Sequence, residues 1–223
     1  MFATLTSFSS LFMATLFMWL GVGLFNVFMG LRLSEDNVSE IWIGALMSAY
    51  YAGLVLGSRI GHRIIVRVGH SRAFAAAAAT CSVMALAQAL VPEKQVWVVF
   101  RVIAGASMAV QFIVLESWLN EQIENEHRGR IFSFYLVMSG LGIAIGQMAI
   151  ALFPTMDLRP LILVAICHTV GLIPIVWTVR LHPAPQLPAP LDFGYFIRRV
   201  PAGLGTMFVA GAITAAFFAL APV

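Results

Sequence analysis

Charged residues are scarce in this sequence. Of its 223 residues only 10% are Asp, Glu, Lys or Arg, whereas 61% are hydrophobic, and a typical soluble domain carries about 25% charged residues. This shortage excludes an ordinary water-soluble surface and indicates an integral membrane protein. The net charge is only +3, and the basic residues lie in short segments between apolar runs. That distribution is explained by membrane topology and argues against nucleic-acid binding.

Cysteine is scarce too, and the common catalytic motifs are missing. The two cysteines, Cys81 and Cys167, lie in separate apolar runs, which excludes a disulfide framework, a CxxC redox pair and a zinc site built on cysteine pairs. The eleven methionines show no M-x-x-M or H-x-x-x-M spacing, so no metal site is expected. No phosphate-binding loop, dinucleotide fingerprint or nucleophile elbow occurs. We therefore expect neither an enzyme nor a bound cofactor.

Long apolar runs, by contrast, fill the chain. A helix of about twenty apolar residues crosses the hydrocarbon core with its backbone groups hydrogen-bonded internally. The first charge is Arg32, and the uncharged run before it is too long for a signal peptide, so we expect a retained first span. We predict an all-α membrane fold with six spanning helices and the start of a seventh. The predicted spans are residues 7–31, 41–61, 72–91, 96–119, 131–153 and 161–179, followed by 200–223.

The connections between these spans differ in charge. Those on one side of the membrane hold three Lys or Arg, and those on the other side hold nine. The first set is residues 32–40, 92–94 and 156–160, and the second is residues 58–72, the segment after Leu119 and residues 180–199. Positively charged loops stay in the cytoplasm. We therefore expect a multi-pass protein of the bacterial inner membrane whose N-terminus is cytoplasmic.

A proline-rich stretch divides the chain. Residues 181–190, LHPAPQLPAP, contain four prolines and are typical of an extended, semi-rigid linker. We predict a six-helix bundle over residues 1–180, a cytoplasmic linker over 181–199, and the first helix of a second bundle over 200–223. We expect that second bundle to be truncated or missing in this chain.

Two patterns occur in the second connection and the fourth span. In IIVRVGHSR, Arg67, Gly69 and Arg72 fit the form G-x-x-x-D-R-x-G-R-R, but Val66 stands at the aspartate position. In RVIAGASMA, Arg101 and the glycine four residues later form R-x-x-x-G. The first pattern is therefore partial, and the second is complete.

A third pattern, together with these two, carries a resemblance. Gly142 and Gly146 in SGLGIAIGQ match the start of G-x-x-x-G-P, with Gln147 in place of the proline. The six-span arrangement and the three patterns resemble the major facilitator superfamily. The combination LESWLNEQ…HRGRIFSFY…GLGIAIGQ is similar to its YcaD-like bacterial branch, and the resemblance covers essentially the whole chain as an N-terminal half and the beginning of a second half.

The resemblance implies secondary active transport of a small solute by alternating access, with or without coupling to protons. The implied partners are the lipid bilayer, the small-molecule substrate and a C-terminal six-helix half. The segment with Arg67, Gly69 and Arg72 would then be a conformational gating loop. A second hypothesis stays open: a half-transporter that serves as an accessory or assembly subunit of a larger membrane complex, with other membrane subunits as partners and no transport activity.

Polar residues inside the predicted spans are the candidates for a substrate or proton pathway, since a charge at the centre of a spanning helix costs roughly 2.5–3.5 kcal/mol on insertion scales. Arg101 and Glu116 are fifteen residues apart, about 22 Å along a helix, so they cannot form a salt bridge with each other. Alternatives remain: Arg101 could snorkel to the interface, and Glu116 could tether helix ends. The candidates are Asn26, Tyr50, Arg101, Gln111 and Glu116.

Glycine spacing and one histidine complete the sequence evidence. Gly105, Gly142 and Gly146 are expected at close helix-packing surfaces, because glycines four residues apart let helix backbones approach. His168 lies in the sixth span, which the resemblance places outside the transport cavity, so we expect a structural role for it.

Overall fold

A computed structural model of the chain describes residues 8–123, 126–155, 157–177, 194 and 198–220. Within these ranges the structure is helical, without a β-strand. Most of the predicted proline-rich linker lies outside the described residues. The helices are α2 (Ser9–Glu35), α3 (Glu40–Val68), α4 (His70–Leu90), α5 (Lys94–Gln122), α6 (Arg128–Ala149), the 3-10 turn η1 (Ile150–Leu152), α7 (Arg159–Trp177) and α9 (Pro201–Leu220).

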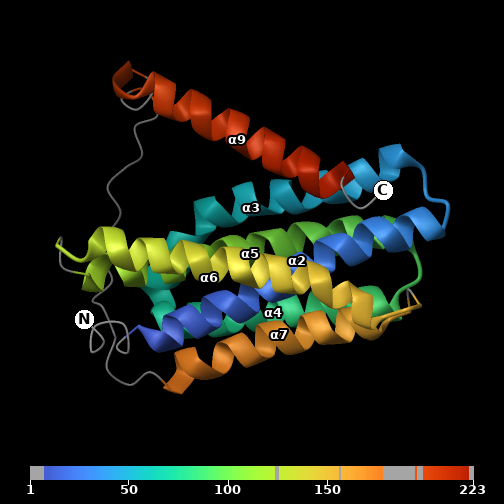
Figure 1. Cartoon of the computed structure of the whole chain (residues 1–223), viewed down its shortest axis with the longest axis horizontal. Helices are drawn as coiled ribbons and strands as arrows, with labels where there is room; N and C mark the ends of the chain where they lie inside the picture. The colour runs from blue at the N-terminus through green and yellow to red at the C-terminus, as the bar shows by residue number, and fades with distance from the viewer. Residues whose placement is uncertain (1–7, 124–125, 156, 178–193, 195–197, 221–223) are drawn as a thin grey trace.

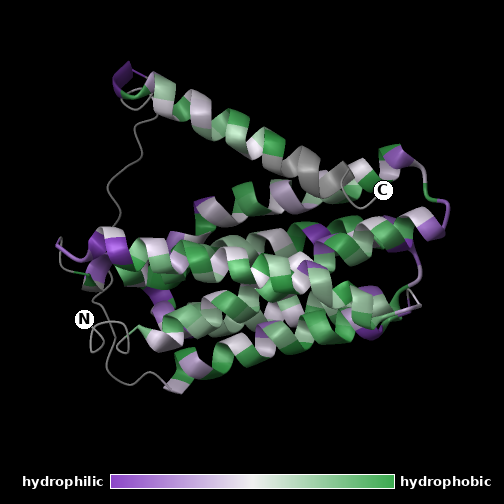
Figure 2. Cartoon of the chain, viewed as in Figure 1, coloured by the Kyte–Doolittle hydropathy of each residue, from purple (hydrophilic) through white to green (hydrophobic). Residues whose placement is uncertain are grey.

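Six of these helices, α2 to α7, are long and apolar enough to cross a membrane, as predicted. They lie roughly side by side, and α9 crosses over α3 (Figure 1). Hydrophilic residues gather at the two ends of the bundle, and hydrophobic residues fill the helices between (Figure 2). We call the end at which α2 begins the first end. The end with the α2–α3, α4–α5 and α6–α7 connections is the opposite end.

Most helices extend beyond the predicted spans, because a spanning length was counted on apolar residues alone, whereas helical hydrogen bonding continues into the polar connections. The longest extension is in α3, which continues to Val68. It ends at Gly69, whose N–H donates to the Ile65 carbonyl and whose φ of +86° is the left-handed conformation that glycine adopts without strain. The sharp α3–α4 connection therefore depends on this glycine.

The helices pair in a repeated pattern. α2 packs along α6 and α7, α5 packs along α3 and α4, and α4 packs along α7. If α2, α3 and α4 are matched in order with α5, α6 and α7, each of these contacts has its counterpart. The six helices are thus two structural repeats of three, an arrangement known from transporter folds.

Glycines lie at both equivalent interfaces. At the α2–α6 interface, a Cβ added to Gly23 would lie 2.5 Å from the Ile143 carbonyl oxygen, and one added to Gly142 would lie 2.6 Å from that of Leu16. Real Cβ atoms do not approach this closely, so these backbones touch only because the side chain is absent. Gly146 lies in the same interface, one turn along α6.

The α3–α5 interface is built in the same way. Cβ atoms on Gly53 and Gly57 of α3 would collide with carbonyl oxygens of α5, and a Cβ on Gly105 of α5 would collide with the carbonyl oxygen of Tyr50. Two glycines one turn apart on one helix thus face a single glycine on its partner in both interfaces. We refer to these two interfaces as the glycine seams.

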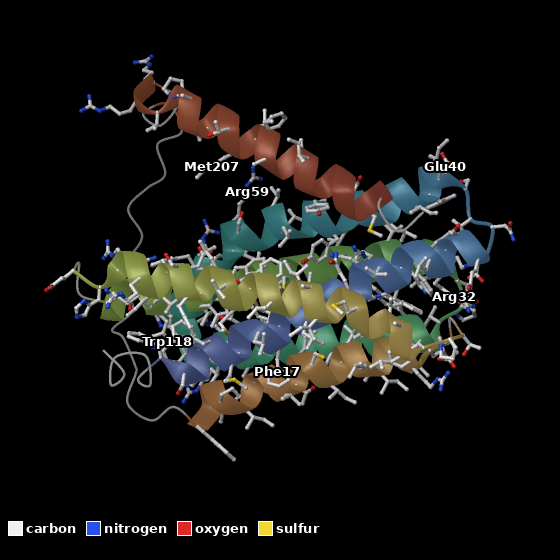
Figure 3. All side chains as sticks on the ribbon, in the orientation of Figure 1. Phe17, Arg32, Glu40, Arg59, Trp118 and Met207 are labelled. Carbon is white, nitrogen blue, oxygen red and sulfur yellow. The ribbon has the colours of Figure 1, made fainter. Side chains whose placement is uncertain are left out.

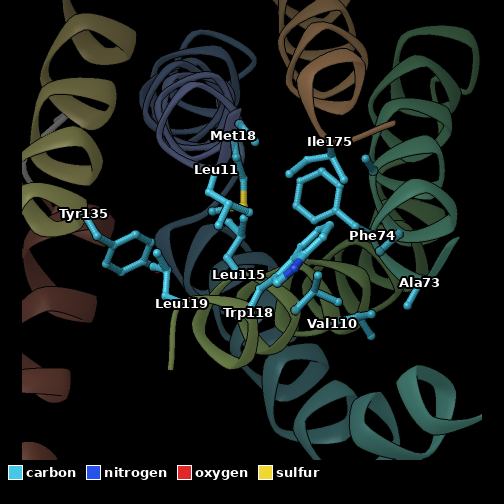
Figure 4. Close-up of a cluster of buried hydrophobic side chains, with 14 of the residues drawn as sticks. Leu11, Met18, Ala73, Phe74, Val110, Leu115, Trp118, Leu119, Tyr135 and Ile175 are labelled. Carbon is cyan, nitrogen blue, oxygen red and sulfur yellow. The ribbon is translucent and has the colours of Figure 1, made fainter. Parts of the chain in front are cut away.

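Large side chains fill the remaining interior in two clusters. One lies toward the first end and includes Leu11, Phe74, Leu115 and Trp118, all 1% exposed or less. Figure 4 shows these side chains directed inward from α2, α4 and α5. The other cluster includes Phe28, Leu33, Leu46 and Leu161 at the opposite end. The bundle therefore has a packed core along its whole length.

An ionic cluster joins two connections at the opposite end. The Asp36 carboxylate lies 3.2 Å from Arg32 Nε and accepts a hydrogen bond from Lys94 Nζ, and Arg32 is at this end in Figure 3. Partial burial raises the pKa of Asp36, but the hydrogen bond from Lys94 and the two nearby cations lower it more, so the pKa is below its usual value. Asp36 thereby links the end of α2 to the start of α5.

The glycine seams predict a specific effect of side-chain size. Gly105→Val should destabilise the protein by about 1–3 kcal/mol or more, because the added atoms force α3 and α5 apart. The matched control is Gly140→Val, since a Cβ at Gly140 has nothing within 4 Å. Unfolding of both variants in detergent measures the difference. Equal stability of the two variants would contradict the close packing described for this seam.

The Asp36 cluster predicts a dependence of stability on pH. The pKa of the Asp36 carboxyl is lower in the folded protein than in the unfolded chain, so the ionised carboxylate stabilises the fold at a pH above its ordinary pKa. This contribution is about 1 kcal/mol or less. It is lost as the pH falls through the lowered pKa. Acidification from about pH 6 to about pH 3 should therefore lower the melting temperature of the unaltered protein more than that of Asp36→Asn. The exposed Glu93 provides a control as Glu93→Gln. Equal acid sensitivity of the Asp36→Asn variant and the unaltered protein would refute this role.

Candidate functional site

Arg101 lies inside the bundle between α2, α3 and α5, with 1% of its surface exposed. Its Nε donates a hydrogen bond to the Leu46 carbonyl at 3.3 Å, and its Nη2 lies 3.5 Å from Met47 Sδ. The guanidinium carbon is 4.9 Å from the ring centre of Phe25 and 4.6 Å from that of Tyr50. The side chain is therefore enclosed by neutral groups and two aromatic faces, and the snorkelling alternative does not hold.

The charge of Arg101 has no ionic partner in the part of the chain that the structure describes. No carboxylate there lies within 4.0 Å of it, and its Nη1 has no hydrogen-bond acceptor. Burying a cation costs several kcal/mol after relaxation. Each desolvated contact between the cation and an aromatic face stabilises it by up to about 2 kcal/mol. The bundle thus holds a charge at an energetic cost, and such residues in membranes are usually functional.

Gly105 explains why the arginine reaches these partners. It lies one helical turn after Arg101 on α5, and it lets the α3 backbone approach so closely that a Cβ would collide with the Tyr50 carbonyl oxygen. The same approach brings Leu46 and the Tyr50 ring within reach of the guanidinium. The two residues of the R-x-x-x-G pattern therefore act together. Gly105 lets α3 come close, and Arg101 then reaches the main chain and the aromatic ring of α3.

A small internal cavity adjoins this arginine. Its volume is about 20 Å³, which is enough for about one water molecule and far below the 300–1,000 Å³ of typical small-molecule sites. It shares Phe25 and Tyr50 with the surroundings of Arg101. The other side chains that line it include Asn26, Cys81, Met108 and His168. This cavity is an internal gap of the bundle, too small to be a substrate pocket.

His168 lines the same cavity as the predicted pathway residues Asn26 and Tyr50. The histidine is buried, lines the internal cavity from α7, and its Nδ1 has no hydrogen-bond partner among the described residues. A structural role was expected for it, and that role stays a prediction. The cavity is lined by residues of α2, α3, α4, α5 and α7. The only sequence signal was a polar residue in an apolar helix.

Gln111 lies deeper along α5 than Arg101. It is 1% exposed, and its Nε2 donates to Cys81 Sγ at 3.2 Å, which joins α5 to α4. Its Oε1 has no partner among the described residues. Four of the five predicted pathway residues, Asn26, Tyr50, Arg101 and Gln111, are therefore buried inside the bundle rather than on its surface.

Glu116 differs from these four because it is exposed. Its main-chain carbonyl accepts a hydrogen bond from Asn120 Nδ2 at 2.9 Å, whereas its carboxylate makes no ion pair in the described part of the chain. Figure 4 shows Tyr135 directed from α6 toward α5. Arg101 and Glu116 thus belong to different parts of the molecule, as their spacing predicted.

The predicted gating loop lies at the first end. Arg67 and Arg72 are exposed on either side of Gly69. Sequence reasoning missed the neighbouring His70, which is buried and whose Nε2 lies 4.0 Å from Glu121 Oε1. This contact connects the start of α4 to the end of α5. The gating role of the loop stays a prediction.

Comparison with known proteins places the chain in a family. Residues 11–223 match the family described as Major Facilitator Superfamily. The chain belongs to the major facilitator superfamily. It is 22% identical to the uncharacterized MFS-type transporter YcaD of Escherichia coli O139:H28 (strain E24377A / ETEC) over 213 residues, which are 93% of this chain and 55% of that protein.

Two further relatives agree with this assignment. An uncharacterized MFS-type transporter of Enterobacter sp. (strain 638) is 27% identical over 140 residues, or 63% of this chain and 37% of that protein. One of Yersinia pestis (strain Pestoides F) is 23% identical over 210 residues, or 91% of this chain and 54% of that protein. The chain thus spans about half the length of the curated relatives it matches, and its six spanning helices correspond to an N-terminal half of this fold.

Proposed function

We propose that the protein carries out secondary transport of a small solute by alternating access, with this six-helix bundle as one of two halves. The buried Arg101 is the observation that carries the proposal, because the bundle keeps a charge in its interior without an ionic partner among the described residues. Family membership and the two three-helix repeats support it. The substrate would bind between the halves, near the middle of the membrane.

The glycine seams support a rigid-body form of alternating access. They lock α2 to α6 and α3 to α5 through backbone contacts, so the bundle would rock as a unit against a second half. The relatives are about twice as long as this chain, which is consistent with a C-terminal six-helix half as the partner. The accessory-subunit alternative has no feature of the described residues in its favour.

The orientation follows from charge. The first end carries most of the Lys and Arg of the connections, so we place it in the cytoplasm of a bacterial cell, with the opposite end outside the inner membrane. In the proposal, Arg101 acts from within the bundle on substrate or proton coupling rather than from an open surface. Its free Nη1 and the adjacent cavity would accommodate one water molecule in that role.

Transport by the protein at its full natural length tests the proposal. In proteoliposomes with an imposed proton gradient, the unaltered protein should move at least one member of a broad solute panel. Arg101→Met should reduce that flux by about tenfold or more, because it removes the buried charge. Arg159→Gln, at an exposed arginine that is the first residue of α7, should leave it nearly unchanged.

Two results would overturn this proposal separately. If no solute in the panel moves, the transport function itself is refuted. If transport occurs and Arg101→Met is as active as the unaltered protein, transport stands and the assignment of Arg101 is refuted.

A further inference from the structure

A cavity of about 830 Å³ lies at the opposite end of the bundle. Its volume is within the range of about 300–1,000 Å³ that is typical of small-molecule sites. Its walls come from the end of α2, the end of α4 with the connection that follows, the start of α5, and the segment before α7. We call it the end cavity. It is separate from the internal cavity beside Arg101, which is about 20 Å³.

The end cavity has a buried floor and an exposed mouth. Among its lining residues, Phe28, Gln88 and Trp97 are at most 5% exposed, whereas Leu90 is 82% exposed. Phe28 lies eight residues before Asp36, which also lines the cavity, and this separation is about 12 Å along a helix. The cavity therefore reaches from the polar end of the bundle into its apolar interior.

The floor offers one hydrogen-bond acceptor among apolar groups. Gln88 Nε2 donates to the Met84 carbonyl at 3.1 Å, but Gln88 Oε1 has no partner among the described residues. Trp97 Nε1 donates to the Val91 carbonyl at 2.7 Å, so this indole already has its hydrogen bond. Buried polar atoms are normally hydrogen-bonded. The floor therefore suits a ligand with an apolar body and a donor that reaches Gln88 Oε1.

Positive charge exceeds negative charge in the ionic cluster on the wall. Arg32 and Lys94 share the single carboxylate of Asp36, so two cations and one anion leave a net charge of +1. The other lining carboxylate, Asp157, accepts a hydrogen bond from Arg159 Nε at 2.7 Å and is neutralised by it. The ionic cluster therefore attracts an anion.

Other classes of ligand fit the end cavity less well. An organic cation would be repelled by the excess charge of the ionic cluster, and a neutral apolar molecule would desolvate the charged wall without pairing it. The described residues contain no group of three His, Cys, Asp or Glu that could hold a metal ion. The nearby Glu35 and Glu93 are exposed and are not among the described residues that line the cavity.

We propose that the end cavity binds an amphipathic organic anion, an acid whose apolar body carries a hydrogen-bond donor. The acid group pairs with Lys94 and Arg32, the donor reaches Gln88 Oε1, and the apolar body lies against Phe28 and Trp97. This site goes beyond the proposed transport function. The end cavity is enclosed by helices of one six-helix bundle, whereas the transported solute would bind between two halves.

Binding of indole-3-acetate to the detergent-purified protein of full natural length tests this inference, because the compound combines a carboxylate, an aromatic body and an N–H donor. Equilibrium dialysis with the labelled compound should show saturable binding. Tryptamine, which keeps the indole but carries an ammonium group, should bind at least about tenfold more weakly. 1-Methylindole-3-acetate lacks the N–H donor and should bind about threefold more weakly or worse.

Four variants locate the binding site in the end cavity. Lys94→Gln removes a cation and should weaken binding of indole-3-acetate by about tenfold. Asp36→Asn should strengthen it several-fold, because it removes the carboxylate that competes for the two cations. Gln88→Leu should weaken binding of indole-3-acetate and leave that of 1-methylindole-3-acetate nearly unchanged. The control Arg128→Gln removes an exposed cation at the first end and should bind as the unaltered protein does.

The inference is overturned if indole-3-acetate shows no saturable binding, or if tryptamine binds equally well. It is also overturned if Lys94→Gln binds indole-3-acetate as tightly as the unaltered protein does. If Lys94→Gln does not fold, Asp36→Asn decides in its place, and unchanged or weaker binding by that variant refutes the site. These measurements do not involve transport, so the end cavity and the proposed function can fail independently.

Discussion

The close approach of α3 and α5 at Gly105 is the constraint on which the interior of this protein depends. Because no side chain separates the two backbones there, a guanidinium one turn away on α5 reaches a main-chain carbonyl and an aromatic ring of α3. The equivalent seam between α2 and α6 has the same arrangement of glycines and also joins the two repeats. Together the seams make the six helices a stiff unit, and a stiff unit can hold a charge in its core.

This arrangement divides the polar residues of the membrane region into two groups with different physical roles. Arg101, Gln111, Asn26 and His168 are buried in the interior. Asn26 and His168 line a cavity of about the size of one water molecule. Glu116 is exposed on α5, near the first end of the bundle. The first group is enclosed by the bundle, whereas Glu116 is accessible from outside it.

The sequence was sufficient for the architecture because apolar length, proline spacing and loop charge report directly on membrane spans. The all-α fold, the six spans and the superfamily were predicted from it. It could not place individual side chains around each helix. Most spans are apolar on every face, so their periodicity does not distinguish the face that packs from the face that is open. For that reason the sequence did not show that Arg101 is enclosed while Glu116 is exposed, and the His70–Glu121 contact was not foreseen.

The central claim is that aromatic faces hold Arg101 inside the bundle, and a double-mutant cycle between Arg101→Met and Tyr50→Leu measures this most directly. Unfolding of the parent, the two single variants and the double variant in detergent should give a coupling free energy of about 0.5–2 kcal/mol. Tyr50→Phe keeps the ring and should keep most of the coupling. If the effects of Arg101→Met and Tyr50→Leu are additive within about 0.3 kcal/mol, the guanidinium does not depend on that ring, and the account of the buried charge is contradicted.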